Sequence, residues 1–262
     1  MNLGLKDKSV IIMASSSGLG KAIATEFARE GAKLMLFSTN KEKLVKTKNE
    51  IYKITGNEPL FTVGDITNYE DIKRLIANTV NAYSGIYALV NNSGGPPAGN
   101  FENFNDEIWQ KSFELTLLSY IRTIREVLPY MKKDGGGRII NSTSSSIKQV
   151  LDNLILSNTF RMGVVGLSKS LSQELGKYDI LVNVIAPGRI GTERIDYLDN
   201  LRAEKLGISV SALQEKTYKS IPLGRYGNPE EYGKLAVFLC SKANTYITGQ
   251  TVLLDGGLTK AY

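Results

Sequence analysis

The chain has 262 residues, of which 42% are hydrophobic, and its formal net charge of +6 is spread along the sequence. This length fits one large α/β domain, and the apolar fraction is sufficient for a packed core. The single cysteine, Cys240, excludes an internal disulfide, and the absence of histidine excludes serine–histidine triads and most zinc sites. Any acid–base chemistry must therefore come from hydroxyls, carboxylates or amines.

Neither a membrane nor a nucleic acid is expected as a partner. No apolar run approaches the length of a membrane span, and residues 1–8 lack the apolar core of a signal peptide. The basic residues form no concentrated stripe, and no nucleic-acid-binding module is recognisable. With its one cysteine, the chain fits the reducing environment of the cytoplasm.

Short apolar runs alternate with helical patterns along the whole chain. Strands are predicted in the run that begins at Val10 and at residues 33–37, 60–63, 87–90, 138–142, 180–185 and 251–254. Helices are predicted after the first strand and at residues 40–54, 69–83, 106–131, 153–176 and 230–241, with a further basic, helical segment that ends near residue 220. This alternation predicts one domain over residues 1–262, with a Rossmann-like, doubly wound parallel sheet of about seven strands and helices on both faces.

The first strand runs into a turn of serine and glycine that opens a helix. The candidate phosphate-binding residues in it are Ser15, Ser17, Gly18, Leu19 and Gly20. A strand, a tight turn and a helix N-terminus present backbone N–H groups to an anionic phosphate. Gly18 allows a ligand to approach the backbone, and Gly20 allows the helix to pack close to the strand. Ala14 stands where a dinucleotide fingerprint has its first glycine, so a plain βα turn is the alternative.

Four further polar turns close predicted strands. They contain Asp65 with Ile66, Asn92 with Ser93 and Gly94, Ser144, and Pro187 with Gly188. The carboxyl ends of parallel strands meet in one crevice, so these turns and the first one are expected to line a single ligand site. A helix cap at Asp65 or an ordinary loop at Pro187 explains each turn alone but not their coincidence.

Three motifs in the last third of the chain carry a resemblance to a known family. They are Ile-Pro-Leu-Gly-Arg-Tyr-Gly-Asn-Pro-Glu-Glu at residues 221–231, Tyr-Ile-Thr-Gly-Gln at residues 246–250 and Asp-Gly-Gly at residues 255–257. With them, the whole chain resembles a single-domain short-chain dehydrogenase/reductase, close to the 3-oxoacyl-acyl-carrier-protein reductases. The resemblance implies hydride transfer between a nicotinamide cofactor and a carbonyl or alcohol. It also implies a substrate lid at about residues 192–220 and a homotetramer built on the two long helices.

The same resemblance assigns cofactor-binding positions at the strand ends. Asp65 and Ile66 would hold the adenine, Asn92, Ser93 and Gly94 would line the adenosine ribose side, and Pro187, Gly188, Ile190 and Thr192 would contact the nicotinamide half. Ser93 stands where the family usually has alanine.

The end of the second predicted strand bears on the choice of cofactor. Ser38, Thr39 and Asn40 occupy it, followed by Lys41, and no carboxylate occurs before Glu42. NAD-dependent enzymes usually place an acidic residue there to bind the ribose 2′-hydroxyl. Hydroxyls, an amide and a lysine suit a 2′-phosphate instead, so NADP is predicted, with NAD as the alternative. The arginine usual in NADP-dependent relatives is absent.

The family's catalytic residues are a serine, a tyrosine and a lysine, with an asparagine in support, and this chain departs from that pattern. The serine corresponds to Ser144; the family's spacing of thirteen then places Ser157 at the tyrosine position, and Arg161 four residues later at the lysine position. The asparagine, seven residues after Trp109, corresponds to Thr116. Ser144 is thus expected to anchor the carbonyl, with an altered proton route through Ser157 and Arg161.

Two function classes follow from this departure. A serine hydroxyl is a far poorer acid than a phenol of pKa about 10, and arginine stays protonated, although it can stabilise an oxyanion. The first class is an NAD(P)-dependent oxidoreductase with the altered proton route. The alternative is a catalytically impaired dinucleotide-binding protein that acts as a sensor or assembly subunit.

The lid carries groups that suit either a substrate or solvent. Tyr197 and Tyr218 could each bring a phenol to the site. Its basic residues are Arg194, Arg202, Lys205, Lys216 and Lys219. An acidic substrate or an acyl-carrier partner fits these charges, and a solvated helix pair explains them equally well.

Overall fold

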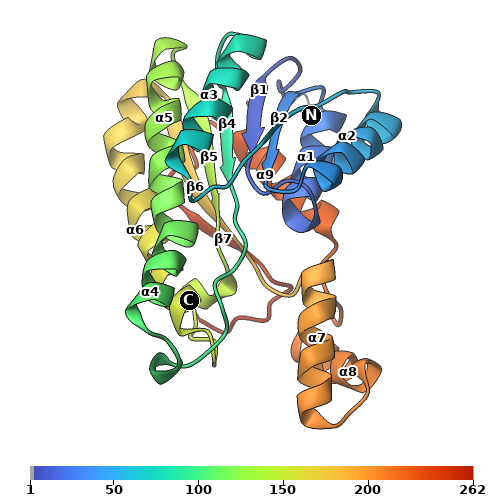
Figure 1. Ribbon diagram of the computed structural model, residues 1–262. Coiled ribbons are helices and arrows are strands. Elements are labelled where there is room, and N and C mark those ends of the chain that lie inside the picture. The colour runs from blue at the N-terminus through green and yellow to red at the C-terminus, as the bar shows by residue number, and fades with distance from the viewer. Residues whose placement is uncertain (1–2, 262) are drawn as a thin grey trace.

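The computed structural model describes residues 3–261 and contains a seven-stranded sheet (Figure 1). The strands are β1 (Ser9–Ile12), β2 (Lys33–Ser38), β3 (Leu60–Val63), β4 (Ala88–Asn91), β5 (Gly137–Ser142), β6 (Ile180–Pro187) and β7 (Thr251–Leu254). Their order in the sheet is β3-β2-β1-β4-β5-β6-β7, and every neighbouring pair is parallel. The predicted doubly wound parallel sheet is confirmed.

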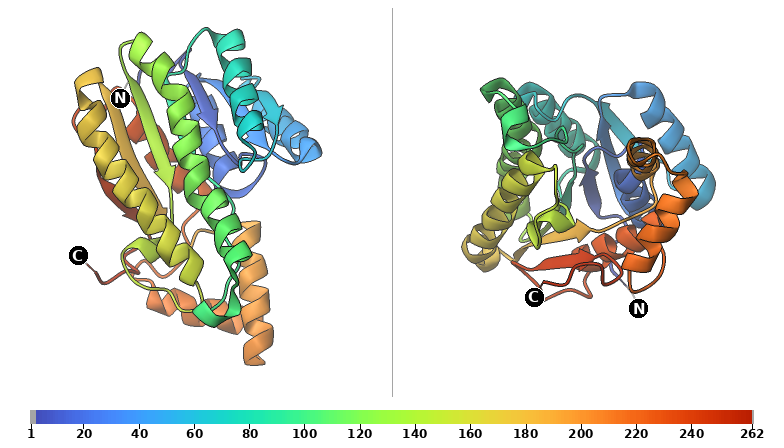
Figure 2. Two further views of the ribbon diagram at one scale, coloured as in Figure 1. Left: turned by 60° about the vertical axis from the view of Figure 1, so that its left-hand side comes forward. Right: turned by 90° about the horizontal axis from the view of Figure 1, so that it is seen from below.

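Helices cover both faces of this sheet. They are α1 (Gly18–Arg29), α2 (Lys41–Thr55), α3 (Tyr69–Tyr83), α4 (Asp106–Phe113), α5 (Ser119–Lys133), α6 (Ile155–Leu175), α7 (Glu193–Leu206), α8 (Val210–Ser220) and α9 (Pro229–Cys240). Helices α1, α2 and α9 lie on one face, and α3, α5 and α6 lie on the other, where α5 and α6 run side by side (Figures 1 and 2).

The apolar strands bury both of their faces, which produces two cores. In β1, Val10 and Ile12 pack with α1, α2 and α9, whereas Ile11 packs with α3, α5 and α6. Alternate side chains of a strand point to opposite sides, so a strand between two helical layers is apolar at every position. This explains the continuous apolar run at the start of the chain.

The predicted helix at residues 106–131 is interrupted in the structure. A π-helical turn, Glu114–Leu118, separates α4 from α5, and α5 continues to Lys133. The hydroxyls of Ser112, Thr116 and Ser119 each donate to the carbonyl four residues earlier, a bonding pattern that bends helices. Apolar periodicity does not report such a change in backbone bonding.

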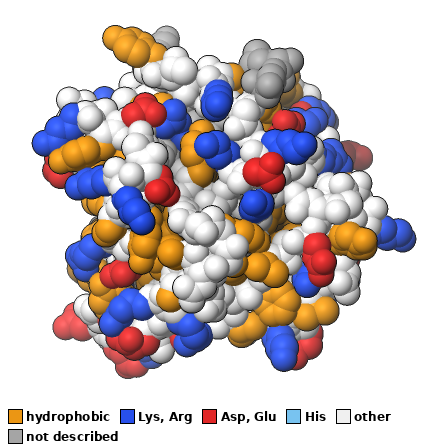
Figure 3. All heavy atoms as spheres, turned by 90° about the horizontal axis from the view of Figure 1, so that it is seen from above, with side chains coloured by type: hydrophobic (Ala, Val, Ile, Leu, Met, Phe, Trp, Pro, Cys, Tyr) orange, Lys and Arg blue, Asp and Glu red, His pale blue; other side chains and the backbone are white. Residues whose placement is uncertain are grey.

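Helices α7 and α8 project from the body beyond the carboxyl ends of the strands (Figure 1). Viewed from below, the carboxyl ends of the strands face the viewer, with these two helices at one side (Figure 2, right). On the opposite face, at the amino ends of the strands, lysines and arginines are scattered among acidic residues (Figure 3). Within residues 3–261, no helix is both long and apolar enough to cross a membrane.

Candidate active site

The glycine turn after β1 has two residues in the left-handed backbone region. Ala14 has φ +47° and Gly18 has φ +53°. A Cβ atom added to Gly20 would collide with the Ala14 carbonyl, so α1 packs as close to the strand as the sequence suggested. Ala14 thus adopts the strained conformation that glycine usually supplies.

A cavity of about 450 Å³ opens beside this turn. Its lining includes Ser16, Ser17 and Gly18 from the turn, and Lys43 and Lys46 from α2. Within residues 3–261 neither lysine forms a salt bridge, although Glu50 belongs to the same lining, where the hydrogen bond from Lys21 and then the charges of Lys21 and Lys46 lower the pKa of its carboxyl. Backbone at a helix N-terminus, hydroxyls and the lysines of α2 form a donor set that fits the phosphates of a dinucleotide.

The three serines of the turn have different surroundings. Ser15 is fully buried; its hydroxyl accepts from Phe37 N at 3.0 Å, and its own N–H donates to Phe37 O. Ser15 therefore fixes the turn to β2, and its predicted contact with the cofactor stays a prediction. Ser16, which the motif analysis missed, is hydrogen-bonded through Oγ to Ser38 Oγ at 2.8 Å. No sequence motif marks Ser16, because the pairing of β1 with β2 brings these hydroxyls together.

Beyond Ser38, the other candidates at the end of β2 are exposed. Thr39 and Asn40 lie at the surface, and Asn40 Oδ1 accepts from Lys43 N at 2.7 Å as the N-cap of α2. The cap explains why α2 starts at Lys41 rather than at residue 40, and it occupies the Asn40 carbonyl oxygen.

The turns after β3 and β4 flank the glycine turn. Asp65 Oδ1 accepts from both N and Oγ1 of Thr67 at 2.8 Å, while Ile66 is buried in the core. Asp65 thus stabilises its own turn, and the N-cap of α3 is Asn68 instead. Asn92 Nδ2 donates to the Ala14 carbonyl at 3.5 Å.

The next two positions of the β4 turn differ in their surroundings. Ser93 Oγ lies 3.5 Å from the Tyr120 hydroxyl. Space is open at Gly94, where an added Cβ would meet nothing within 4 Å.

The loop after β6 reaches the glycine turn from the other side. An added Cβ at Gly18 would lie 3.9 Å from Thr192 Cγ2, and Thr192 caps α7 through Oγ1. Gly188 has no room for a Cβ against Asp255, and Ile190 is buried and pairs with Gly227. Pro187 ends β6. The structure therefore brings Thr192, at the end of this loop, beside the glycine turn.

A buried polar network supports the strand ends beneath the crevice. Asn91 Nδ2 donates to Asn141 Oδ1 at 2.9 Å, and Thr123 Oγ1 donates to Asn91 Oδ1 at 2.6 Å. Asn141 Nδ2 in turn donates to Ser168 Oγ at 2.9 Å. These interactions join β4, β5, α5 and α6, and such a satisfied network rigidifies the floor of the site.

The four predicted catalytic positions lie on the turn after β5, on the π-helical turn and on α6. Ser144 follows β5, and its Oγ accepts from Ser146 N at 3.2 Å. Thr116 lies in the π-helical turn, is fully buried, and donates its hydroxyl to Ser112 O. Ser157 lies on α6 one turn before Arg161, is 7% exposed, and makes no side-chain hydrogen bond within residues 3–261.

Arg161 is a buried cation bonded to the backbone of β5. It is 6% exposed, and Nη1 donates to Ser142 O at 3.2 Å. The Tyr120 hydroxyl donates to the same carbonyl at 2.9 Å. Burial raises the pKa of Tyr120, and the charge of Arg161 partly offsets this rise. Tyr120 is a phenol that no sequence motif marks; it donates its proton to a backbone carbonyl and lies beside the Arg161 guanidinium.

The two lid tyrosines that could supply a phenol, Tyr197 and Tyr218, form no hydrogen bond or ring contact with the predicted catalytic residues within residues 3–261. Tyr197 is 63% exposed on α7. The Tyr218 ring packs edge-on against Tyr226 at 4.9 Å. Arg194, in contrast, extends from the first turn of α7 to Gly95, where its Nη2 would lie 2.6 Å from an added Cβ.

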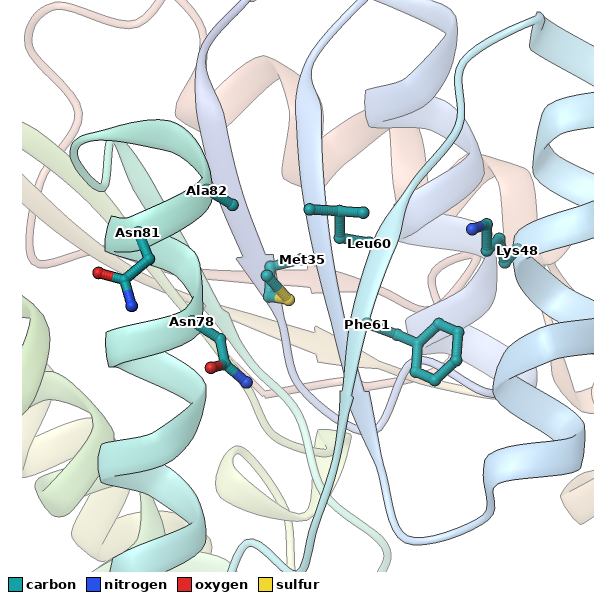
Figure 4. Close-up of a pocket in the computed structure, with 7 residues that line it drawn as sticks. All are labelled: Met35, Lys48, Leu60, Phe61, Asn78, Asn81 and Ala82. Atoms are coloured by element: carbon teal, nitrogen blue, oxygen red, sulfur yellow. The ribbon is translucent and has the colours of Figure 1, made fainter.

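A second cavity, of about 460 Å³, lies at the amino end of β3, away from the strand carboxyl ends (Figure 4). Asn78 and Asn81 of α3 and Phe61 of β3 are among its lining residues. Its lysine, Lys48, pairs with Glu58 at 2.8 Å. This cavity therefore offers no free charge to a ligand.

Comparisons with known sequences agree with this geometry. The family model described as Enoyl-(Acyl carrier protein) reductase matches residues 13–259. Dehydrogenase/reductase SDR family member 4 of Sus scrofa is 32% identical over 260 residues, which cover 97% of this chain and 88% of that protein. The 3-oxoacyl-acyl-carrier-protein reductase FabG of Thermotoga maritima is 32% identical over 256 residues, which cover 97% of this chain and 98% of the relative.

Solved structures match along the full length. L-sorbose reductase from Gluconobacter frateurii, complexed with NADPH and L-sorbose, has a TM-score of 0.95 at 30% identity, with 100% of both chains covered. YwfH, an NADPH-dependent reductase involved in bacilysin biosynthesis, has a TM-score of 0.92 at 28% identity and covers 97% of this chain and 99% of its own.

The doubly wound sheet, with a phosphate-type turn and polar groups at its carboxyl ends, defines a dinucleotide-dependent oxidoreductase. The chain belongs to the short-chain dehydrogenase/reductase family, whose members use NAD(P) to interconvert carbonyls and alcohols. The oxidoreductase function predicted from the sequence is therefore supported over the non-catalytic alternative.

Proposed function

We propose that this chain uses NADPH to reduce the carbonyl group of a small molecule. The observation that carries the proposal is the cavity in which the glycine turn, two lysines of α2 and Thr192 meet. No carboxylate stands at the end of β2, so nothing there repels a 2′-phosphate. The L-sorbose reductase of the same fold was solved with NADPH.

The cofactor assignments follow the same crevice. Residues 15–20 would hold the phosphates and residues 38–40 the 2′-phosphate end, with Asp65 and Ile66 at the adenine. Asn92, Ser93 and Gly94 would line the ribose. Residues 187–192 would hold the nicotinamide half. When bound, the reduced nicotinamide supplies the hydride, and the carbonyl oxygen must gain a proton.

The residues at the end of β5 would supply that proton and stabilise the oxygen. Ser144 Oγ already accepts from a backbone N–H, so its own hydroxyl is free to donate to the substrate oxygen. Arg161, a permanent cation, would stabilise the oxyanion that develops there. The unbonded Ser157 hydroxyl would pass a proton from water to the same oxygen, while Thr116 would support the π-helical turn.

The direct test combines cofactor titration with turnover of a panel of aldehydes and ketones. Wild-type protein should bind NADPH more tightly than NADH and oxidise NADPH when a carbonyl substrate is present. Ser144→Ala should lower kcat by about 10²–10³-fold with the NADPH Kd unchanged, since it removes one donor to the oxyanion.

Ser146→Ala is the matched control, because the buried Ser146 hydroxyl has no hydrogen-bond partner among the described residues and its removal should leave kcat unchanged. Binding of NADPH without turnover of any carbonyl would instead favour the sensor function. No binding of either cofactor would refute the proposal as a whole.

We further propose a cytoplasmic homotetramer with residues 192–220 as the substrate lid of one domain. The family resemblance supports the tetramer, and exposed apolar side chains on α6, such as Met162, are consistent with contacts between copies. The cytoplasmic location is supported by Cys240, a fully buried free thiol. Light scattering that gave the mass of one 28.8 kDa chain would contradict the tetramer.

A further inference from the structure

The positive charge of Arg161 has no counter-charge in the site. Arg161 is only 6% exposed, and within residues 3–261 no carboxylate pairs with it. Its Nη1 donates to the Ser142 carbonyl, and the guanidinium lies beside the Tyr120 hydroxyl. Among the described residues, every buried nitrogen of Arg161 has a hydrogen-bond partner. The nitrogens without a partner are therefore accessible to solvent or to a ligand. A buried cation of this kind requires an anion or strong acceptors from elsewhere.

A second unpaired arginine approaches the same place from the lid. The Arg194 guanidinium lies against Gly95 in the loop after β4 and has no acidic partner in the described part of the chain. Burial against this loop lowers the pKa of Arg194, and the positive charge of Arg161 lowers it further, although the side chain remains open to solvent. Two like charges thus converge at the carboxyl end of the sheet.

Two arginines near the lid, unlike Arg161 and Arg194, have acidic partners. Arg189, just before the lid, pairs with the buried carboxylate of Asp199 at 3.2 Å. Arg225, just after it, forms two hydrogen bonds to Glu231 at 2.7 and 2.9 Å. The two arginines that face the site are therefore left unpaired while those around them are neutralised.

We propose that the substrate is a carbonyl compound with a carboxylate close to the reacting carbon, held by Arg161 and Arg194. This inference rests on the proposed reductase function. A guanidinium binds a carboxylate through two parallel hydrogen bonds, and the second guanidinium remains for the oxyanion formed at the carbonyl. An oxo acid supplies both negative groups, one before and one during hydride transfer.

The anion that these arginines take is the substrate's rather than the cofactor's. Arg161 donates to Ser142 of β5, two residues before Ser144 in the chain. The glycine turn, Lys43 and Lys46 border a separate cavity beside α1 and α2. Phosphates bound in that cavity would already have donors from the turn and from the lysines.

The experiment compares Arg194→Gln with Arg202→Gln, which changes an exposed arginine farther along α7 that forms no ion pair within residues 3–261. Malonate, a dicarboxylate that is not reduced, is titrated by calorimetry into the full-length protein with and without NADPH. Arg194→Gln should weaken malonate binding about ten- to a hundred-fold, since a hydrogen bond to a charged group is lost, and Arg202→Gln should not. Turnover of acetoacetate is compared with that of ethyl acetoacetate. Wild type should prefer the acid, and Arg194→Gln should lose that preference.

Two results would overturn this inference while the proposed function stands. One is equal binding of malonate by both variants, or equal turnover of acid and ester by wild type. The other is a weaker NADPH affinity in Arg194→Gln, which would assign the arginine to the cofactor's phosphates. Failure of wild type to bind NADPH would instead refute the proposed function. The malonate titration without cofactor would then still test whether Arg194 binds a carboxylate.

Discussion

Ala14 holds a left-handed backbone conformation that costs an alanine about 1–2 kcal/mol. Ala14→Gly should therefore raise the free energy of unfolding by about 0.5–1 kcal/mol, after the greater flexibility of glycine in the unfolded chain is subtracted. Urea unfolding curves measure this difference. Gly18→Ala is the counterpart: it has room for a methyl group but φ +53°, so it should destabilise by a similar amount. A loss of stability in Ala14→Gly would contradict the strain argument.

The departure at Ser157 and Arg161 gives a second prediction at the residue scale. Ser157→Tyr with Arg161→Lys restores the phenol and amine of the family, so kcat on a neutral ketone should rise about 10²-fold or more. A neutral ketone is used because Arg161 is also proposed to bind carboxylates. The control is Phe160→Tyr with Arg161→Lys, since the Phe160 ring packs against Trp109 and Phe113. Equal rates in the two double variants would show that the assigned roles are wrong.

At the scale of elements, the start of α9 depends on one carboxylate. Glu231 accepts from Asn228 N at 2.7 Å in a capping box and binds both Nη atoms of Arg225. The hydrogen bond from Arg225, followed by that from Asn228, lowers the pKa of Glu231 to about 2. The ionised form therefore stabilises the folded state, and this contribution is lost as the pH falls from about 4.5 towards 2.

Glu231→Gln should lower the free energy of unfolding at neutral pH by roughly 0.5–1 kcal/mol, a modest loss because the ion pair is partly exposed to solvent. The gap between wild type and variant should close below about pH 4 in thermal or urea unfolding. Glu230→Gln, the adjacent carboxylate without an ion pair in residues 3–261, should show no such change. A gap that stayed constant down to pH 2 would contradict the coupling.

At the scale of the whole molecule, the cofactor cavity is assembled from segments far apart in the sequence. The glycine turn, α2, Thr192 and the start of α9 all border it. Lys43→Gln with Lys46→Gln should raise the NADPH Kd about ten- to a hundred-fold while the NADH Kd stays unchanged, since only the 2′-phosphate loses partners. Calorimetric titration measures both constants.

The control for that pair is Lys53→Gln, an exposed lysine in the last turn of α2. Higher salt should weaken NADPH binding by wild type more than by the double variant, because exposed charges are screened. An equal loss of NADH affinity in the double variant would show that these lysines serve the shared part of the two cofactors.

Much of the site could be predicted from single segments of sequence, and some of it could not. The turns at Gly18, Asp65 and Asn92 were located correctly at strand ends, because strand boundaries are local. Tyr120 carries no motif that relates it to Arg161, since the two side chains come together only when α5 and α6 pack around the Ser142 carbonyl. The break in the long helix was also missed, because hydroxyl-to-backbone bonds leave the apolar spacing unchanged.

The sequence alone determined the type and order of the elements and the family, because apolar periodicity and turn residues act over a few positions. It also determined that the chain has no histidine, and it predicted serine and arginine at the family's tyrosine and lysine positions. Only the tertiary structure decided which charges converge. Arg194 extends from the lid to Gly95, near the buried Arg161, while Arg189 and Arg225 find acidic partners. Pairing between residues distant in sequence depends on how whole helices are placed, and no local pattern encodes that placement.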